Sequence, residues 1–254
     1  MTILTAFVQT IGNVFKHGLH FKNYSYRETV NAFKIDLGMF QGNFGQVFRK
    51  LTWGLPNTLV GNLIAHGYNI AGKVNRVTLL EGAIALDGPM GDDYVAFSMG
   101  GYLFGPNEFK ADWRDHLFVH EYGHFLQGLT WGPFFLPVIA LPSLASAGGV
   151  ATGGVKHDKR WFEVDASRRG MKYFDTEYGL WKRRSGQSKD QFFDKESFSE
   201  GSPSAYINPR TGRFNGYKAR SPVSGAQFSP LGDVALPLLS FLLVGFLIQT
   251  SNRS

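Results

Sequence analysis

Apolar residues recur at helical intervals in two segments of the first fifty residues. Residues three or four apart lie on one face of an α-helix, so this spacing predicts a helix with an apolar side. The first segment, Thr2–His17, lacks the basic start and small-residue cleavage pattern of a secretory signal. We expect an amphipathic helix there, packed on the body or lying at a membrane surface. The second segment, Phe40–Lys50, aligns on one side Phe40, Phe44, Val47, Phe48 and Leu51.

The pattern changes to that of β-strands after residue 74. The runs Asn75–Asp87 (NRVTLLEGAIALD) and Tyr94–Phe104 (YVAFSMGGYLF) are rich in β-branched and aromatic residues, and the turn-forming sequence GPMGDD lies between them. Such side chains favour strands, whereas glycine and proline mark turns. The sequence therefore predicts two antiparallel strands in this region.

A long helix is predicted from Ala111 to Thr130. Asp112 is a suitable N-cap, because a carboxylate there accepts a hydrogen bond at the positive end of the helix dipole, and Gly128 is a suitable stop. Apolar residues occupy almost every face of this helix, including Trp113, Leu117, Phe118, Val119, Phe125, Leu126 and Leu129. A helix that is apolar all round is a buried, central one.

This helix carries the sequence His-Glu-Tyr-Gly-His at residues 120–124. His120 and His124 lie one turn apart, so both imidazoles can bind one metal ion, and Glu121 can reach a metal-bound water. Zinc in such a site lowers the pKa of its bound water from about 16 to roughly 7, and the glutamate accepts the proton. A pattern with two free positions also arises by accident. Two histidines and a glutamate are nevertheless costly to bury without a partner, and a metal ion serves all three.

A catalytic zinc site usually has three protein ligands and a water molecule, so a third ligand must lie elsewhere. The three-histidine continuation of the motif is excluded, because Gln127 and Thr130 stand where its glycine and histidine would be. The segment Arg160–Phe174 has helical spacing, and one face holds Glu163, Ala166, Ser167, Gly170 and Phe174. We predict Glu163 as the third ligand, since the small residues after it let this helix lie close to the first. The alternative is an amphipathic helix with a merely solvated glutamate, and the competing ligands are His157, Asp158 and Asp165.

Three stretches, HEYGHFLQ, GPFFLPVIALPSLAS and WFEVDASRRGMKYF, resemble a group of small bacterial proteins with a zincin-like H-E-x-x-H core. The resemblance covers roughly residues 51–174. It implies that His120, His124 and the downstream Glu163 are zinc ligands and that Glu121 is the catalytic acid. The wider zincin class also implies an edge strand that pairs with the substrate backbone, for which residues 98–103 are the candidate. An ordinary core strand weakened by two glycines is the alternative.

The chain departs from better-known zincins around the third ligand. Those proteins have asparagine just before the glutamate and aspartate four residues after it, to orient the ligands. Here Phe162 and Ser167 occupy these positions. Asp165 or a backbone carbonyl could take over the orienting role.

The composition agrees with one substantial globular domain. The chain has 254 residues, of which 43% are hydrophobic and 15% aromatic, which is enough to bury a core. It contains no cysteine, so disulfide bonds and thiolate ligands are excluded and a metal must be held by His, Asp or Glu. The net charge of +6 is modest, and the cations between Lys182 and Arg220 are interspersed with acidic residues, which argues against nucleic-acid binding.

Two apolar segments bear on membrane association. Phe125–Val155 has no charged residue, but three prolines interrupt it, which favours a hydrophobic loop that covers the site or dips into one leaflet. Leu231–Ile248 is an 18-residue, mainly apolar stretch, and we predict a membrane-spanning or anchoring segment there rather than a buried helix. Basic residues precede this stretch, which would leave the body cytoplasmic. Ser185–Pro230 is too aromatic for a linker and predicts an irregular lobe on a domain of residues 1–230.

The sequence thus predicts an α+β, zincin-like domain with an active-site helix against a small antiparallel sheet, followed by a hydrophobic C-terminal segment. We expect a membrane-associated metallopeptidase that binds Zn²⁺ and hydrolyses peptide or protein substrates. Candidates for orienting the ligands or stabilising the oxyanion are His157, Asp165 and Tyr173. A non-catalytic protein that uses the metal to brace two helices is one alternative, and an interaction module without metal is another.

Overall fold

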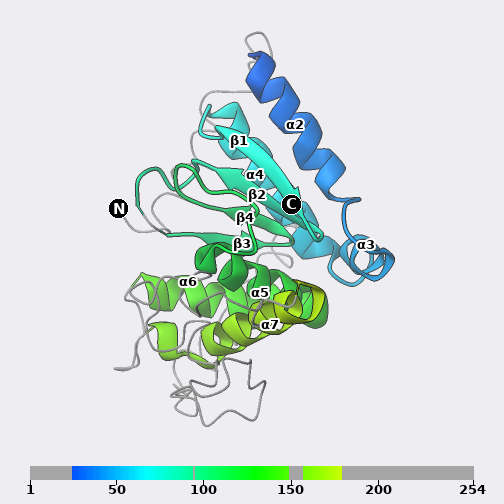
Figure 1. Cartoon of the computed structure of the whole chain (residues 1–254), viewed down its shortest axis with the longest axis vertical. Coiled ribbons are helices and arrows are strands. Elements are labelled where there is room, and N and C mark those ends of the chain that lie inside the picture. Colours follow the sequence, from blue (N-terminus) through cyan, green and yellow to red (C-terminus); the bar gives the residue numbers. More distant parts are fainter. Residues whose placement is uncertain (1–24, 94, 149–156, 179–254) are drawn as a thin grey trace, which may run out of the picture.

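A computed structural model describes residues 25–93, 95–148 and 157–178 of this chain (Figure 1). The predicted N-terminal helix at Thr2–His17, the irregular lobe at Ser185–Pro230 and the membrane segment at Leu231–Ile248 lie outside the described residues. Within them the chain is α+β, with helices on both sides of a small sheet (Figure 1).

The sheet has four strands in the order β1-β2-β4-β3, namely β1 (Arg76–Leu80), β2 (Ala83–Asp87), β4 (Tyr102–Phe104) and β3 (Phe97–Met99). The pairs β1–β2 and β3–β4 are antiparallel, but β2 and β4 are parallel. The prediction of two antiparallel strands was therefore wrong, because each run folds back on itself as a hairpin. The two-residue turns Glu81-Gly82 and Gly100-Gly101 have positive φ at both positions, as tight hairpin turns require.

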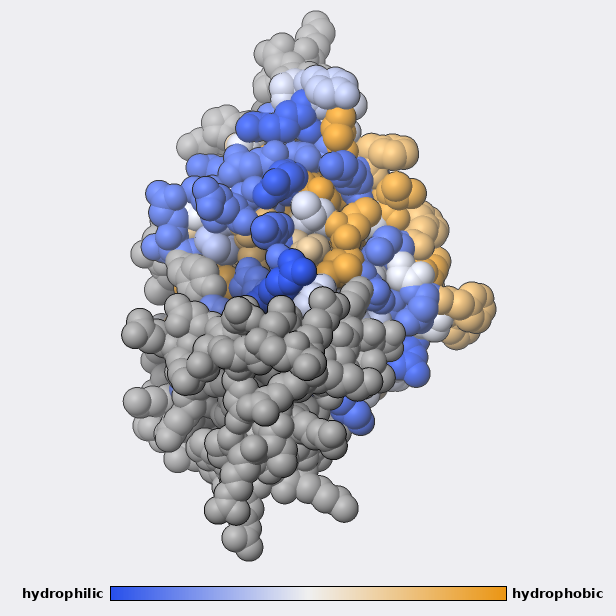
Figure 2. Space-filling view, viewed as in Figure 1, coloured by the Kyte–Doolittle hydropathy of each residue, from blue (hydrophilic) through white to orange (hydrophobic). Residues whose placement is uncertain are grey.

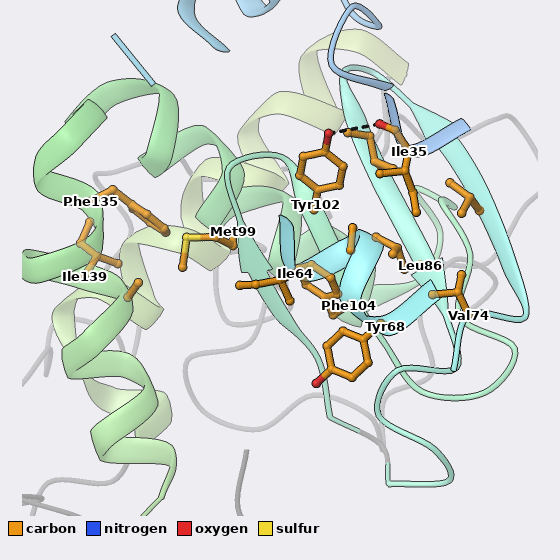
Figure 3. Close-up of a cluster of buried hydrophobic side chains, with 14 of the residues drawn as sticks. Ile35, Ile64, Tyr68, Val74, Leu86, Met99, Tyr102, Phe104, Phe135 and Ile139 are labelled. Carbon is orange, nitrogen blue, oxygen red and sulfur yellow. Dashed lines mark hydrogen bonds between the residues drawn. The ribbon is translucent and has the colours of Figure 1, made fainter. Parts of the chain in front are cut away.

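Two helices, α2 (Tyr26–Gly38) and α4 (Leu55–Ile70), cover one face of the sheet, and α3 (Phe44–Leu51) packs against α4 and α5. α2 and α4 bury a cluster of apolar side chains against this face of the strands, in which Ile35, Tyr68 and Phe104 are prominent (Figure 3). The hydroxyl of Tyr102 donates a hydrogen bond to the carbonyl of Ile35 at 3.1 Å and joins the sheet to α2 (Figure 3). Side chains alternate across a strand, so the intervening residues face the other way.

The helices α5 (His116–Trp131) and α7 (Trp161–Tyr178) lie on the opposite face. A second cluster forms there between the sheet and the two helices, with Leu103, Phe118, Tyr122 and Phe174 at its centre. The sheet is thus enclosed on both sides, and α5 is the buried, central helix that its composition predicts.

The apolar stretch after α5 lies beside the outer strand β3 (Figure 1). It forms the short turns η2 (Gly132–Phe134) and η3 (Leu136–Ala140) and the helix α6 (Leu141–Ala147), and η4 (His157–Lys159) precedes α7. In the described residues no helix by itself has the length and apolar composition of a membrane span. The pair His116–Phe134 and Leu136–Ala147, bent by 119°, meets these criteria only when the two are taken together.

Helix α3 differs from its prediction. It begins at Phe44 rather than Phe40, because Asn43 caps it and Gln46 completes a reciprocal capping box. The apolar side recognised in the sequence is largely exposed, with Phe44 at 85% and Phe48 at 57%. Gln46 and Lys50 are the residues that α3 buries. Periodicity located this helix, but it did not indicate which face the rest of the protein would cover.

Candidate metal centre

Helix α5 presents His120, Glu121 and His124. Its N-cap is Asp115, whose side chain accepts from the backbone N–H of Leu117 at 2.9 Å, and not the predicted Asp112. The helix also continues past the predicted stop at Gly128 and ends at Gly132, which has a φ of 55°. These differences move the helix ends but leave the two histidines one turn apart on the same face.

Helix α7 lies in close contact with α5 through two glycines. A Cβ added to Gly123 would overlap the backbone carbonyl of Ala166, and one added to Gly170 would overlap the carbonyl of Val119. Only glycine permits this approach, since any side chain would hold the two backbones apart. The close approach predicted from the small residues of Arg160–Phe174 is therefore present, and it brings Glu163 against the histidines of α5.

The three side chains converge on one point. Glu163 Oε2 lies 3.0 Å from His120 Nε2 and 3.0 Å from His124 Nε2. One ligand atom from each residue lies within 4.8 Å of the others, and both His124 and Glu163 are buried. Tetrahedral zinc with ligand bonds of roughly 2.0–2.1 Å separates neighbouring ligand atoms by roughly 3.3 Å, close to the two 3.0 Å distances from Glu163. Two imidazole nitrogens and a carboxylate oxygen also form a donor set that suits zinc. These residues could hold a metal ion.

The remaining ring nitrogens are held by hydrogen bonds. His120 Nδ1 lies 2.8 Å from the hydroxyl of Ser167, and His124 Nδ1 lies 2.8 Å from Gln127 Oε1. Gln127 donates in turn to the carbonyl of Phe162 at 2.8 Å and to Asp165 at 3.0 Å. These contacts direct both Nε2 atoms toward Glu163, as is usual for histidines that bind a metal.

Several residues share the role of orienting the three candidate ligands, which the sequence had not assigned. Ser167, where better-known zincins have aspartate, contacts His120 directly, while Asp165 acts on His124 through Gln127. Asp165 also accepts from Arg169 Nε at 2.6 Å. The hydroxyl of Ser143, from α6, donates to Glu163 Oε1 at 2.6 Å. Both oxygens of the buried carboxylate therefore have partners.

The electrostatic coupling within this group is strong. Burial opposes ionisation of Glu163, but the charges of His157 and His124 and the hydrogen bonds from His120 and His124 hold its pKa well below the usual range. Burial would likewise lower the pKa of His124, but the Glu163 carboxylate and the hydrogen bonds to it raise this pKa to about 9. The carboxylate is therefore ionised and strongly favours a cation beside it.

Glu121 differs from Glu163 in its surroundings. Its side chain is 4% exposed, and Oε2 has no hydrogen-bond partner among the described residues. Burial raises its pKa above the ordinary value, and the nearby His124 and His120 only partly offset that effect. An unpaired buried carboxylate oxygen is costly to maintain and is expected where a group must meet a substrate or a water molecule.

A cavity of about 300 Å³ opens beside Glu121 and the three converging side chains. Its walls are mainly apolar and come from α4, β3 and the segment after α5, with contributions from Val60, Ile64, Phe97, Met99, Leu136 and Leu144. β3 is an edge strand of the sheet. The predicted edge strand, residues 98–103, is only partly correct, because 100 and 101 form the turn and Tyr102 and Leu103 belong to the inner strand β4.

Of the other predicted site residues, some lie at the cavity and others lie away from it. His157 lines the cavity, with Nε2 at 3.6 Å from Glu163 Oε1 and Nδ1 at 2.6 Å from the hydroxyl of Ser146. Asp158 and Asp165 do not belong to the converging group found in the described residues. Tyr173 lies elsewhere, at the edge of the second core cluster, where its hydroxyl donates to Glu81 at 2.7 Å.

Sequence reasoning missed two contributors to this centre. Ser143 lies in an apolar, proline-containing stretch with no motif around it, and only folding brings it onto Glu163. In the sequence, Gln127 served only to exclude a three-histidine motif. Its position three residues after His124 is a signal that could have been used, since such residues face each other on a helix.

Comparison of the chain with models of protein families, with curated proteins and with solved structures finds no match. The function must therefore be argued from the residues and their geometry.

Proposed function

We propose that this protein is a zinc-dependent metallopeptidase. The observation that carries the proposal is that a converging His-His-Glu group and a buried Glu121 oxygen without a partner in the described part of the chain lie at one cavity. A site that only braced two helices would gain nothing from leaving Glu121 Oε2 without a partner among the described residues, because an unsatisfied buried carboxylate oxygen destabilises the fold. The zincin-like resemblance of the sequence around residues 120–124 supports the same assignment.

Each residue has a distinct role in this proposal. His120, His124 and Glu163 hold the zinc ion, which supplies Lewis acidity and a water of lowered pKa when bound. Glu121 accepts a proton from the attacking water and delivers it to the leaving amine. Its raised pKa suits both steps, since a carboxyl with an ordinary pKa is a poor acid near neutral pH. Ser167 and Gln127 keep the imidazoles in the orientation that binds metal.

The apolar walls of the cavity favour peptides with apolar side chains near the cleaved bond. β3 lines the same cavity and is an outer strand of the sheet in the described residues, so its outer edge could pair with an extended peptide. The apolar sequence at Leu231–Ile248 adds the proposal of a membrane-associated enzyme whose body is cytoplasmic.

The variant Glu121→Gln tests the proposed reaction. We expect it to bind zinc with unchanged stoichiometry, because Glu121 is not a ligand, and to lose peptide cleavage by at least about a hundredfold. Cleavage of a defined peptide mixture is measured by mass spectrometry beside metal analysis of the same sample. Glu108→Gln, which changes an exposed glutamate, is the matched control. Cleavage that survives in Glu121→Gln would show that the general base has been wrongly assigned.

A structural metal site is the second candidate, and the position of His157 favours it. Its Nε2 lies 3.6 Å from Glu163 Oε1, near enough to become a fourth protein ligand, and structural zinc sites are usually closed by four. His157→Ala separates the two candidates. Zinc affinity reduced to the level of a ligand deletion would identify a closed structural site, whereas retained zinc with altered cleavage supports an enzyme.

A further inference from the structure

One side of the molecule is apolar over three consecutive helices. Exposed large side chains gather there on α2 and α3 (Figure 2), and α4 adds two more. Phe44 is 85% exposed, Leu63 70% and Phe33 67%. We use the term apolar face for the outward residues Tyr26, Phe33, Leu37, Phe40, Phe44, Phe48, Leu59 and Leu63. Single exposed apolar residues are ordinary, but eight large ones on neighbouring helices indicate an interaction surface.

The helices beneath this face bury polar residues. α2 directs Asn31 inward, and α3 directs Gln46 and Lys50 inward, all of them nearly inaccessible to solvent. Lys50 Nζ donates to the carbonyls of Gly38 and Gln41 at 2.8 and 2.7 Å. A surface helix of a protein in water normally has the opposite arrangement, with apolar residues inward and polar residues outward. α2 also buries Ile35, so the inversion is clear in α3, which buries Gln46 and Lys50. It indicates that the outward side of α3, with Phe44 and Phe48, meets an apolar partner.

Charge and helix length point to a lipid bilayer as that partner. Between residues 25 and 75 the exposed charged side chains are the cations Arg27, Arg49 and Lys73 and one acid, Asp36. Aromatic and leucine side chains flanked by cations are typical of helices that lie in the headgroup region of anionic membranes. The three helices have 13, 8 and 16 residues, and crossing a bilayer takes about 20, so they would lie in the plane of the surface.

The apolar face continues to the rim of the cavity. Trp53, which is 48% exposed, follows α3, and its ring centroid lies 6.2 Å from that of Phe134. Phe134 is 46% exposed and precedes the segment that lines the cavity, where Leu141 is again partly exposed. α4 itself faces both ways, with Leu59 and Leu63 outward and Ile64 toward the cavity. Contact with a bilayer through this face would bring lipid close to the cavity.

We propose that the apolar face docks on an anionic lipid bilayer, with Phe33, Phe44 and Phe48 inserted among the headgroups. The sequence Leu231–Ile248 is long enough to span a bilayer and would keep the body near that surface. Docking through α2, α3 and α4 is a second, separate contact. It does not depend on the proposed peptidase activity.

The absence of cysteine from the chain permits a site-specific test in the full-length protein. Phe44→Cys carries a polarity-sensitive fluorophore on the apolar face. Lys172→Cys carries the same fluorophore on an exposed position of α7, on the other side of the sheet. Each protein is mixed with vesicles of equal parts phosphatidylcholine and phosphatidylglycerol that contain a lipid-borne quencher. We expect a blue shift and quenching at position 44 and neither at position 172, even if another segment also binds the vesicles.

Matched substitutions and controls complete this test. Phe48→Ser in the labelled Phe44→Cys protein should weaken quenching about tenfold, whereas Phe48→Leu retains it, because burial of one aromatic side chain contributes that much to partitioning. Equal quenching at both positions, or none at position 44, overturns the proposal. A blue-shifted label at position 44 before vesicles are added also overturns it. In that case the labelled protein is diluted. A blue shift that disappears on dilution shows that a second copy covers the apolar face, and one that persists shows that another segment of the same chain covers it.

Discussion

The two helical layers of this protein both bury polar side chains, but with different consequences. In the layer of α2, α3 and α4, Asn31 donates to the carbonyl of Val74 at 3.0 Å and Lys50 donates to three carbonyls. Between α5 and α7, Gln127 also donates to a carbonyl, but His120 and His124 contact the buried carboxylate of Glu163. Glu121 Oε2 has no partner among the described residues. Polar groups satisfied by backbone carbonyls hold helices in place, whereas those that converge at a cavity are available for chemistry.

The largest loss of stability is expected from a substitution that separates α5 from α7. Gly123→Val should lower the free energy of unfolding by at least about 3 kcal/mol and abolish zinc binding, since the added side chain would overlap the backbone at Ala166. Gly128→Ala on the same helix is the control, because its Cβ would meet only the Phe135 ring at 3.9 Å. That change should alter stability by no more than about 1 kcal/mol. Denaturant titration and metal analysis measure both, and equal effects would refute the close contact.

The next largest effect is on zinc affinity, and it should differ between two buried glutamines, one in each helical layer. Gln127→Leu removes the partner of His124 and should weaken zinc binding by about 10–100-fold. Gln46→Leu removes a buried amide that lies 2.9 Å from the hydroxyl of Tyr122, so it should reduce stability and leave zinc affinity unchanged. Competition with a chromophoric chelator gives both affinities. If the two variants bind zinc alike, the hydrogen bond to His124 has no orienting role.

The pH dependence of zinc binding should differ from that of an ordinary histidine site. In the metal-free protein the pKa of His124 is raised to about 9, so a proton must leave when zinc binds at neutral pH. Zinc affinity should therefore rise up to about tenfold per pH unit until pH 9. The folded-state pKa lies above the ordinary value, so the stability that protonation contributes is complete below pH 6.5 and is lost as pH rises through 9. Zinc affinity that is constant between pH 7 and 8 would contradict this coupling.

The smallest expected changes in stability come from substitutions on the buried and the exposed side of α2. Asn31→Ala should lower the free energy of unfolding by about 1–3 kcal/mol, because the carbonyl of Val74 loses its buried donor. Phe33→Ser, two residues away and 67% exposed, should change it by less than about 0.5 kcal/mol. Denaturant midpoints without lipid measure both. A greater loss from Phe33→Ser would mean that the apolar face is already covered within the protein.

Local patterns accounted for much of what the structure contains. The α+β class, the buried helix around residues 120–124 and the helix that carries Glu163 all followed from periodicity, which depends only on residues close in sequence. Errors arose where two local signals competed. Asp112 and Asp115 are both suitable caps, and the structure uses Asp115. The paired glycines 100 and 101 were interpreted as weakening one strand, although they form the turn of a hairpin.

Contacts between distant residues were beyond this reasoning. The hydrogen bond from Ser143 to Glu163 joins an apolar segment to a helix twenty residues later. Neither segment has a sequence pattern that predicts this contact. Tyr173 was a reasonable candidate by chemistry, but α7 turns its hydroxyl toward Glu81 and away from the metal centre. The exposed side of α3 likewise depends on what lies beneath the helix, not on its own pattern.

The sequence by itself determined the chemistry available to this protein: a donor set of two histidines and a glutamate, with a second glutamate beside them and no thiol to compete. Spacing along a helix is a local property, so these groups could be placed on their faces without coordinates. Only the tertiary structure decided that Gly123 and Gly170 bring the helices into contact and that α3 turns its phenylalanines outward. It also decided that Glu121 Oε2 lies at a cavity without a partner in the described part of the chain. Those outcomes depend on which surfaces meet, and that is settled by the packing of the whole chain.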